Sequence, residues 1–321
     1  ARTQLDDVGF RQWARQALAA SGVPRDARID RWCDDCLFFQ PILTGDEADY
    51  RLLAQRIAAL ERSSELPGHR FFYLALPPQA VPEAVLGLGR SGLNRSRGWT
   101  RLVVEKPFGQ DLASARDLNQ HLHQYFDETQ IYRIDHYLGK ETVQNLLAFR
   151  FANPIFETLW NRDRVESVEI TVAETVGVEH RAAFYEQAGA VRDIVQNHLT
   201  QLVALVAMDS PAAFEADAIR NEKVKVVRAI APIAPEDVVV GQYGRGEIDG
   251  QEVRGYLEED GVAPDSTVET YAALRLDLAT WRWHGVPFYI RTGKRLARRV
   301  TQVAVTFRRA PISFFQPFHV H

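Results

Sequence analysis

Two short apolar runs in the first third of the chain constrain its fold more than any other feature. Residues 70–76 (Arg-Phe-Phe-Tyr-Leu-Ala-Leu) and 101–105 (Arg-Leu-Val-Val-Glu) are each closed by a proline within two positions. Their length and composition predict buried strands. Apolar residues at helical spacing follow each run, over 81–88 and 111–124. Because alternating strands and helices pair in parallel through crossovers, we predict an α/β fold whose ligands bind beyond the carboxyl ends of the strands.

The pattern changes after residue 151. Apolar residues alternate with polar ones at 168, 170 and 172 and again at 303, 305 and 307, and strand-forming residues fill 268–278 and 286–290. Alternation of this kind is typical of antiparallel strands. A helix over about 190–208 interrupts them with an apolar stripe. We therefore predict a domain over 1–128 and a larger α+β domain with a mostly antiparallel sheet over 129–321.

The segment from Arg133 to Glu141 brings together several side chains that can exchange protons or bind a charged ligand. It places Asp135, His136, Tyr137 and Lys140 around a single glycine. A helical pattern over 141–149 follows, so Lys140 is expected at a helix start. Since a helix N-terminus offers unpaired N–H groups and positive dipole character, this segment indicates a phosphate or carboxylate site. A solvated turn before an ordinary helix is the alternative.

Composition limits the kind of partner. The 321 residues are 46% hydrophobic and carry a net charge of −4, which argues against nucleic acid as a ligand. Local cations must then hold any anion, and the run 291–299 is the densest basic one. A solvated basic face is the alternative for that run. No apolar stretch approaches the roughly 18 residues of a membrane span, and no signal peptide pattern opens the chain. We expect a cytoplasmic protein without a membrane partner.

Two further motifs are expected to carry no ligand. Cys33 and Cys36 form C-x-x-C, but the chain has no other cysteine for a zinc site, so no metal is predicted. Gly87, Gly89 and Gly92 match G-x-G-x-x-G, yet they follow a predicted helix instead of a strand. We interpret that match as unrelated to dinucleotide binding.

Five segments together carry a family resemblance. They are 72–78 (Phe-Tyr-Leu-Ala-Leu-Pro-Pro), 104–109 (Val-Glu-Lys-Pro-Phe-Gly), 133–141, 192–199 (Arg-Asp-Ile-Val-Gln-Asn-His-Leu) and 285–294 (Gly-Val-Pro-Phe-Tyr-Ile-Arg-Thr-Gly-Lys). In order and spacing they resemble the glucose-6-phosphate 1-dehydrogenase family, over residues 1 to about 299. The resemblance implies a Rossmann-like NADP-binding domain, then a β+α domain for substrate binding and dimerisation.

The chain departs from the family pattern at both ends. The family's first strand and its Gly-rich phosphate turn have no counterpart here, and neither has the family's last portion. We therefore expect an internal fragment with an incomplete Rossmann-like domain, which holds the coenzyme weakly by itself. The family further implies a homodimer or homotetramer.

The resemblance implies oxidation of the C1 hydroxyl of D-glucose 6-phosphate to 6-phospho-D-glucono-1,5-lactone, with hydride transfer to NADP⁺. This is the first step of the oxidative pentose phosphate pathway. Removing the hydroxyl proton calls for a base that titrates near neutral pH, which suits histidine. His198 matches the family's base and Asp135 the carboxylate that orients it. From the helical pattern alone, a histidine beside an apolar face is more often a core residue.

The remaining site residues also follow from the resemblance. His136, Tyr137 and Lys140 match phosphate-binding positions, and Arg299 matches a further basic position that contacts the substrate. Charged residues suited to directional bonds with sugar hydroxyls are Glu174, Asp193 and Lys294. On an ideal α-helix, side chains at 193 and 198 stand about 140° apart, so their spacing does not predict one cluster.

Two residues match positions near the coenzyme. Lys106 matches a residue close to both sugar and coenzyme, and its bond to Pro107 is a candidate for the cis form; a plain strand end is the alternative. Arg2 matches a position near the 2′-phosphate, which favours NADP over NAD.

Two other functions stay open. A different sugar dehydrogenase could share the strand that ends in Glu-Lys-Pro, although the Asp135–Lys140 cluster speaks against it. A truncated chain could instead bind a sugar phosphate or a partner subunit without transferring hydride.

Overall fold

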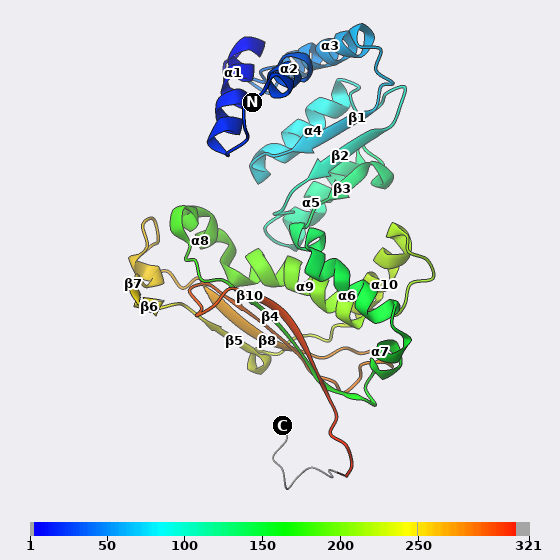
Figure 1. The fold of residues 1–321 in the computed structure, drawn as a ribbon, viewed down its shortest axis with the longest axis vertical. Coiled ribbons are helices and arrows are strands. Elements are labelled where there is room, and N and C mark those ends of the chain that lie inside the picture. The colour runs from blue at the N-terminus through cyan, green and yellow to red at the C-terminus, as the bar shows by residue number, and fades with distance from the viewer. Residues whose placement is uncertain (1–2, 249, 313–321) are drawn as a thin grey trace. The chain divides into compact units, whose positions relative to one another are not determined.

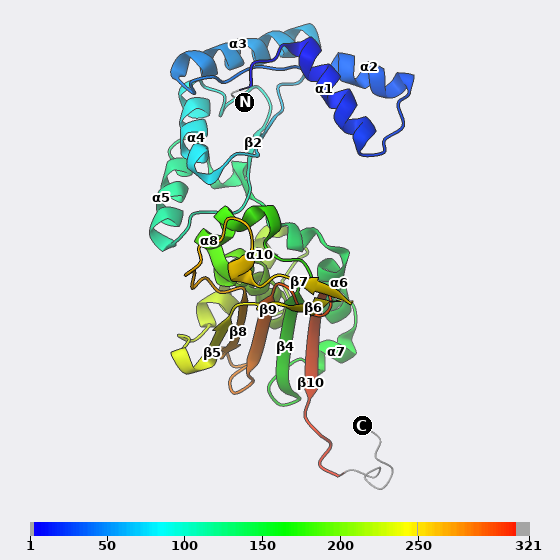
Figure 2. The same cartoon turned by 90° about the vertical axis from the view of Figure 1, so that its left-hand side faces the viewer.

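The computed structural model describes residues 3–248 and 250–312 (Figures 1 and 2). The chain has two compact units, Ala1–Ile134 and Asp135–His321. It is an α/β protein, with a parallel sheet in the first unit and a larger, mostly antiparallel sheet in the second, so the predicted fold class is confirmed. Among the described residues, no helix is long and apolar enough to cross a membrane.

The first unit contains five α-helices and three strands within its described residues. The helices are α1 Asp7–Ala20, α2 Ala27–Cys36, α3 Glu47–Ser63, α4 Val81–Arg90 and α5 Leu112–His123, and the strands are β1 Arg70–Leu74, β2 Thr100–Val104 and β3 Ile131–Arg133. Short 3₁₀ turns lie at Pro78–Ala80 (η1) and Glu128–Gln130 (η2). An aspartate caps four of these helices by accepting backbone N–H bonds, namely Asp6, Asp26, Asp46 and Asp111. Such caps satisfy the unpaired donors of a first turn.

The three strands pair in parallel in the order β1-β2-β3. The alternating pattern predicted the parallel pairing of β1 and β2, whereas β3 was not predicted. Helices α3, α4 and α5 share one core with β2 and with the alternate residues Phe72 and Leu74 of β1. The intervening side chains Phe71 and Tyr73 are 59% and 49% exposed. The prediction of a strand buried on both faces is therefore wrong for β1, because in this unit the helices join the core through only one face of that strand.

Gly87 and Gly89 of the G-x-G-x-x-G match lie within helix α4, and Gly92 lies just beyond it. A Cβ at Gly87 would lie 2.2 Å from the Tyr50 ring, and one at Gly89 would lie 2.1 Å from the Tyr125 ring. Real side-chain atoms do not approach so closely. These two glycines therefore allow aromatic rings to pack directly on the helix backbone.

The second unit places helices over one face of a five-stranded sheet (Figure 1). Its α-helices are α6 Glu141–Phe151, α7 Pro154–Leu159, α8 Ala182–Ala190, α9 Thr200–Ala207 and α10 Ala216–Ala229, and a π-helix, η5, spans Val191–Leu199. Its strands are β4 Val165–Ala173, β5 Val238–Gly241, β6 Gly246–Ile248, β7 Gln251–Val253, β8 Tyr271–Leu276, β9 Phe288–Gly293 and β10 Val300–Phe307. Short 3₁₀ turns lie at His136–Gly139 (η3), Glu179–Arg181 (η4), Pro235–Asp237 (η6) and Tyr256–Glu258 (η7).

The sheet order is β10-β4-β9-β8-β5, which Figure 2 shows edge to edge. Three of its four pairings are antiparallel and β4–β9 is parallel. Its inner face and the apolar stripe of η5 and α9 form the main core of the unit. The apolar stripe was predicted to comprise Val191, Ile194, Val195, Leu202 and either Leu205 or Val206. All of these residues, including both alternatives for the last position, belong to this core or pack against it.

Candidate active site

The structure brings Asp135 and His198 into direct contact although 63 residues separate them in sequence. His198 Nδ1 lies 2.6 Å from Asp135 Oδ1. Asp135 follows β3 and caps the short turn η3, where its Oδ1 also accepts the Tyr137 N–H at 3.0 Å. The carboxylate is thus held by the backbone of its own loop while it orients an imidazole from η5. Such a contact fixes which ring nitrogen faces the carboxylate.

Burial and hydrogen bonding act in opposite directions on the Asp135 carboxyl. The His198 side chain is fully buried and the Asp135 side chain is 14% exposed. Burial by itself raises the pKa of Asp135, but the bond from His198, its charge, the Tyr137 N–H and His136 outweigh burial and leave that pKa lowered. The carboxyl group therefore stays ionised at neutral pH, ready to stabilise a positively charged imidazole.

The π-helix η5 explains how Asp193 joins the same cluster as His198. A π-helix closes its bonds between residues five apart, so positions 193 and 198 lie one above the other. The 140° separation of an ideal α-helix is wrong for this segment. Polar side chains support the widened turns: Asn197 Oδ1 accepts the His198 N–H at 2.7 Å, and Thr200 Oγ1 donates to the Val195 carbonyl at 2.8 Å. Both Asp193 and His198 are buried.

The start of η5 is set by Gly189 and Glu269. Gly189 has φ +61°, and a Cβ there would lie 2.4 Å from Glu269 Oε1. The same Oε1 accepts the Val191 N–H at 3.0 Å, and the Glu269 carbonyl accepts the Ala190 N–H at 2.9 Å. Glu269 thus satisfies the donors exposed at this kink, and only a glycine lets it approach so closely.

Rings and a cation form a stack beside the dyad. The Tyr137 ring lies parallel to the His198 ring with centroids 4.1 Å apart, and Lys140 Nζ lies 3.4 Å from the Tyr137 centroid. His136 meets the His198 ring edge-on at 4.7 Å. Burial raises the pKa of Tyr137, with Glu174 adding to the effect, so its hydroxyl stays neutral. The side chains of residues 136, 137, 140 and 198 therefore form one contiguous cluster.

Lys140 and Arg299 are near enough to the stack for both charges to act on it. Lys140 is the N-cap residue of α6, as predicted. Burial lowers the pKa of Lys140, and the nearby charge of Arg299 lowers it further, while Glu174 and Asp135 oppose the change. Arg299 also acts on Tyr137. Holding like charges together is unfavourable unless an anion lies between them, so this end of the cluster suits a phosphate or carboxylate.

One edge of the five-stranded sheet supplies the remaining charged groups. Ala173 at the end of β4 pairs with Gly293 at the end of β9 and with Val300 at the start of β10. The residues just beyond those ends, Glu174, Lys294 and Arg299, therefore lie at the same edge. Lys294 Nζ lies 2.7 Å from Glu174 Oε2, and the Lys294 side chain is only 8% exposed.

Tyr185 is a site residue that the sequence did not indicate. Its ring centroid lies 5.3 Å from Lys294 Nζ. Burial raises the pKa of Tyr185, and Asp193, Glu269 and Glu174 contribute to that rise. Tyr185 therefore lies where the residues of the sheet edge and those of η5 meet. Its position in α8 next to a glutamate and a glutamine gives no motif by which sequence could have identified it.

The two predicted coenzyme residues belong to the first unit. Lys106 is half-buried just beyond the carboxyl end of β2, and the Lys106–Pro107 bond is cis, as predicted. Arg2 lies outside the described residues.

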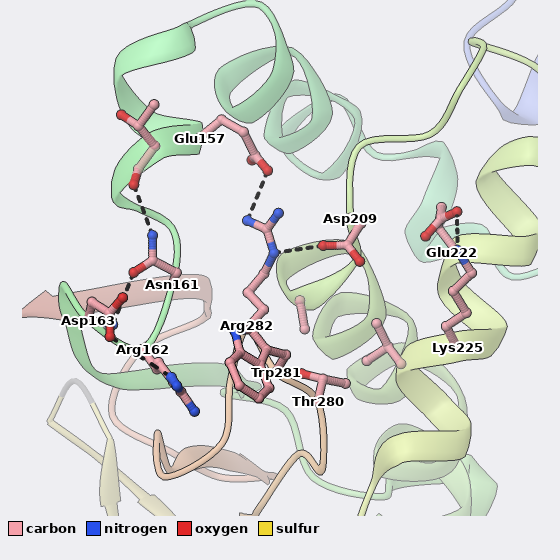
Figure 3. A pocket seen from close by; sticks show the side chains of 13 residues that line it. Glu157, Asn161, Arg162, Asp163, Asp209, Glu222, Lys225, Thr280, Trp281 and Arg282 are labelled. Atoms are coloured by element: carbon pink, nitrogen blue, oxygen red, sulfur yellow. Dashed lines mark hydrogen bonds and ion pairs between the residues drawn. The ribbon is translucent and has the colours of Figure 1, made fainter.

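A hollow of about 540 Å³ elsewhere in the second unit is lined by charged side chains (Figure 3). Arg282 bonds to Glu157 at 2.9 Å and to Asp209 at 2.7 Å, and Lys225 bonds to Glu222 at 2.7 Å. Because these acids are already paired with cations of the same hollow, we assign its charges to structural ion pairs.

Asp135, His136 and His198 are the described residues best placed for a metal. Their potential ligand atoms lie within 4.8 Å of one another. We assign no metal to this group, because the carboxylate of Asp135 and Nδ1 of His198 are already bonded to each other.

The chain is thus an α/β protein of two units, and the unit with the mostly antiparallel sheet holds an imidazole–carboxylate pair of the kind that transfers protons in enzymes. Two family models match the chain. Glucose-6-phosphate dehydrogenase, NAD binding domain, matches residues 1–145, and Glucose-6-phosphate dehydrogenase, C-terminal domain, matches residues 147–320. The chain belongs to the glucose-6-phosphate dehydrogenase family.

Individual relatives agree with this assignment. Glucose-6-phosphate 1-dehydrogenase of Aggregatibacter actinomycetemcomitans is 48% identical over 98% of this chain, and that of Bacillus subtilis (strain 168) is 44% identical over 96%. The chain spans 65% of the length of each of these relatives. A solved glucose-6-phosphate dehydrogenase in complex with its substrate glucose-6-phosphate is similar over 98% of this chain and 65% of its own, with a TM-score of 0.89 and 35% identity. A Mycobacterium avium structure is similar over 98% and 66%, with a TM-score of 0.84 and 39% identity.

Proposed function

We propose that the chain carries the substrate site and the proton-transfer groups of an NADP-dependent glucose-6-phosphate 1-dehydrogenase. The reaction is oxidation of the C1 hydroxyl of D-glucose 6-phosphate to 6-phospho-D-glucono-1,5-lactone. One observation carries the proposal: the bonded pair of Asp135 and His198 lies beside the cations Lys140 and Arg299. This substrate needs a proton acceptor at its C1 hydroxyl and cations at its phosphoryl group.

The chemistry assigned to the dyad is removal of the hydroxyl proton. His198 accepts the proton from the C1 oxygen on Nε2, since Nδ1 is bonded to Asp135. The imidazole becomes positively charged as the C1–H bond breaks, and the ionised Asp135 stabilises that charge. Because the ring is fully buried, this interaction is weakly screened by water.

Substrate binding divides into two groups of residues. At the phosphoryl end, Lys140 and Arg299 supply charge, and His136 and Tyr137 supply hydrogen bonds. The groups proposed to bond the sugar hydroxyls are Glu174, Asp193 and Lys294. Carboxylates and an ammonium held by burial and by each other are pre-oriented, so they lose little freedom when the sugar binds.

The coenzyme is proposed to lie at the carboxyl edge of the parallel sheet in the first unit. Lys106 lies just beyond the carboxyl end of β2, at the edge where such sheets bind ligands. Lys106 would approach both sugar and coenzyme, and Arg2 would hold the 2′-phosphate that distinguishes NADP. When bound, NADP⁺ would supply the hydride acceptor. The oxidative pentose phosphate pathway, a homodimer or homotetramer, and a cytoplasmic location remain predictions from the family.

Calorimetric titration and a turnover assay together test the proposal. Glucose 6-phosphate should bind at least tenfold more tightly than glucose, because two cations contribute to the phosphoryl end. NADP⁺ should then be reduced only when the sugar phosphate is present. Binding of sugar phosphate without any NADP⁺ reduction would favour the non-enzymatic alternative. Equal affinity for glucose and glucose 6-phosphate would contradict the assigned anion site.

A further inference from the structure

The segment between β9 and β10 carries two of the proposed substrate groups, Lys294 and Arg299, and an unusual backbone conformation lies between them. Arg295 has φ +55°, in the left-handed region that residues with a Cβ seldom occupy. Such a conformation persists only where the surrounding structure holds it, and it is enriched at functional sites. Because Arg295 directly follows Lys294, the contacts that hold Arg295 also fix the start of the Lys294 side chain.

Backbone hydrogen bonds tie this segment to the residues beyond β4. The Arg295 N–H donates to the Val176 carbonyl at 3.2 Å, and the Leu296 N–H donates to the Glu174 carbonyl at 2.9 Å. Glu174 is also the ion-pair partner of Lys294. The two proposed sugar-binding side chains therefore extend from adjacent backbone segments, and their geometry depends on how firmly those segments are held together.

Glu259 joins both segments from outside the sheet. It directly follows the 3₁₀ turn η7. Its Oε1 accepts a bond from Arg295 Nη2 at 3.3 Å and another from the Tyr243 hydroxyl at 2.9 Å, and that hydroxyl accepts the Val178 N–H at 3.2 Å. Burial raises the pKa of Tyr243 to about 12, so the hydroxyl keeps the proton that it donates. The Glu259 clamp, formed by the side chains of Glu259, Tyr243 and Arg295, thus links the residues after β9 to those after β4.

The packing around the Glu259 clamp is close. A Cβ at Gly177 would lie 2.5 Å from Glu259 Oε1 and 2.8 Å from Arg295 Nε, so only a glycine in the loop after β4 leaves space for the ion pair. The Arg295 and Glu259 side chains are 21% and 11% exposed, and a partly buried pair of this kind is weakly screened by water. Arg295 Nε is buried and bonds to no described residue, so the guanidinium depends on its bond to Glu259.

We infer that Glu259 and Arg295 are positioning residues, whose ion pair keeps the sugar-binding groups after β4 and β9 in a preformed arrangement. The inference rests on the proposed function, which assigns Glu174 and Lys294 to the sugar hydroxyls. Glu259 and Arg295 act through those two residues and are not assigned a contact with the substrate. Arg299 directly precedes β10, whose pairing with β4 holds it, so the phosphoryl end should not depend on the Glu259 clamp.

Arg295→Asn in the full-length protein tests the inference, because asparagine tolerates a positive φ and lacks the guanidinium. In calorimetric titration its affinity for glucose 6-phosphate should fall by about 3- to 10-fold, since the sugar-binding groups must then be ordered on binding. Its affinity for inorganic phosphate, which occupies only the phosphoryl end, should stay within about twofold of the native value. Arg295→Lys keeps a cation for Glu259 and should recover most of the lost affinity. Arg245→Asn removes an exposed arginine that pairs with Glu258 at 2.9 Å and should change neither affinity.

Amide hydrogen exchange without ligand measures the Glu259 clamp directly. The Leu296 N–H should exchange about 3- to 10-fold faster in Arg295→Asn than in the native protein, because the segment opens more often. Glu259→Gln keeps the shape of the side chain and removes its charge, so it supplies a second variant in which the Leu296 and Val178 amides should both exchange faster. Native exchange rates in the folded variants, or equal losses of affinity for glucose 6-phosphate and inorganic phosphate, would overturn the inference.

The two readouts also separate this inference from the proposed function. A native protein that binds glucose 6-phosphate no more tightly than inorganic phosphate, or that reduces no NADP⁺, would contradict the proposed function. The exchange rates need neither substrate nor turnover. They would still decide whether the Glu259 clamp holds the two segments together.

Discussion

Replacing Asp135 by asparagine tests the central contact of the site. The amide keeps the shape of the carboxyl group, and its oxygen can still accept the Tyr137 N–H, which Asp135 Oδ1 accepts at 3.0 Å. The variant lacks the negative charge of the carboxylate, whose Oδ1 lies 2.6 Å from His198 Nδ1 in the native protein. The variant should therefore fold normally and bind glucose 6-phosphate with nearly native affinity, but turn it over slowly.

The expected loss follows from two contributions. Opposite charges about 4 Å apart interact by about 4 kcal/mol at an effective dielectric constant near 20, and roughly half of that applies if half a charge has formed on the imidazole in the transition state. Replacing a charge-assisted hydrogen bond by a neutral one costs about 1 to 2 kcal/mol more. A total of about 3 to 4 kcal/mol corresponds to a decrease in kcat of about 10² to 10³.

Steady-state kinetics of NADP⁺ reduction, with calorimetry for sugar binding, measures the two effects separately. Asp163→Asn is the matched control, because Asp163 is an 82% exposed carboxylate elsewhere in the same unit. It should leave kcat within about twofold of the native value, in line with other surface substitutions. A kcat for Asp135→Asn within threefold of the native value would show that the carboxylate does not support the imidazole during the reaction.

Three further predictions concern stability and binding. Glu61→Gln should destabilise the protein by about 1 to 3 kcal/mol at pH 7 in urea unfolding, because the Arg70 hydrogen bond keeps the pKa of Glu61 low. This stabilisation is present above the pKa of Glu61 in the unfolded chain, near 4.3, and is lost as the pH falls through the lowered pKa in the folded protein. The unfolding free energies of the native protein and the variant should therefore converge below about pH 4. Gly189→Ala should lower the free energy of unfolding by about 1 to 3 kcal/mol in the same measurement, because Gly189 has a positive φ. Gly241→Ala is the control: nothing lies within 4 Å of its added Cβ, so it should lower the free energy of unfolding by less than about 1 kcal/mol. Lys140→Met should weaken glucose 6-phosphate binding by about 10- to 100-fold and leave glucose binding nearly unchanged; equal losses for both ligands in calorimetry would contradict its assignment to the phosphoryl end.

Local patterns were sufficient to predict most of the fold. Spacing of apolar residues predicted β1, β2, β4, β8, β9, β10 and the stripe on η5 and α9, because each depends on residues close in sequence. The short strands β3, β5, β6 and β7 were not predicted. The exposed face of β1 was not predicted, because Phe71 and Tyr73 are as apolar as their buried neighbours. Which face of a strand is covered depends on how distant helices pack.

The site was harder to predict because its geometry is set by tertiary structure. The contact between Asp135 and His198 joins a loop to a helix 63 residues later, and no periodic pattern spans that distance. The π-helix changed the angular relation of Asp193 to His198, which a regular α-helix would have separated. Family resemblance identified the residues of the site, whereas Tyr185 became visible only from its packing and from the charges around it.

One carboxylate in this protein has two tasks. Asp135 caps the turn that bears His136 and Tyr137, and it also aligns His198. A ligand whose phosphoryl group binds to this turn would consequently also restrict the motion of His198, the proposed proton acceptor at the other end of the ligand. Glucose, which has no phosphoryl group, should therefore show a lower kcat as well as a lower affinity. Binding energy from the phosphoryl group, far from the reacting carbon, would be used to stabilise the transition state.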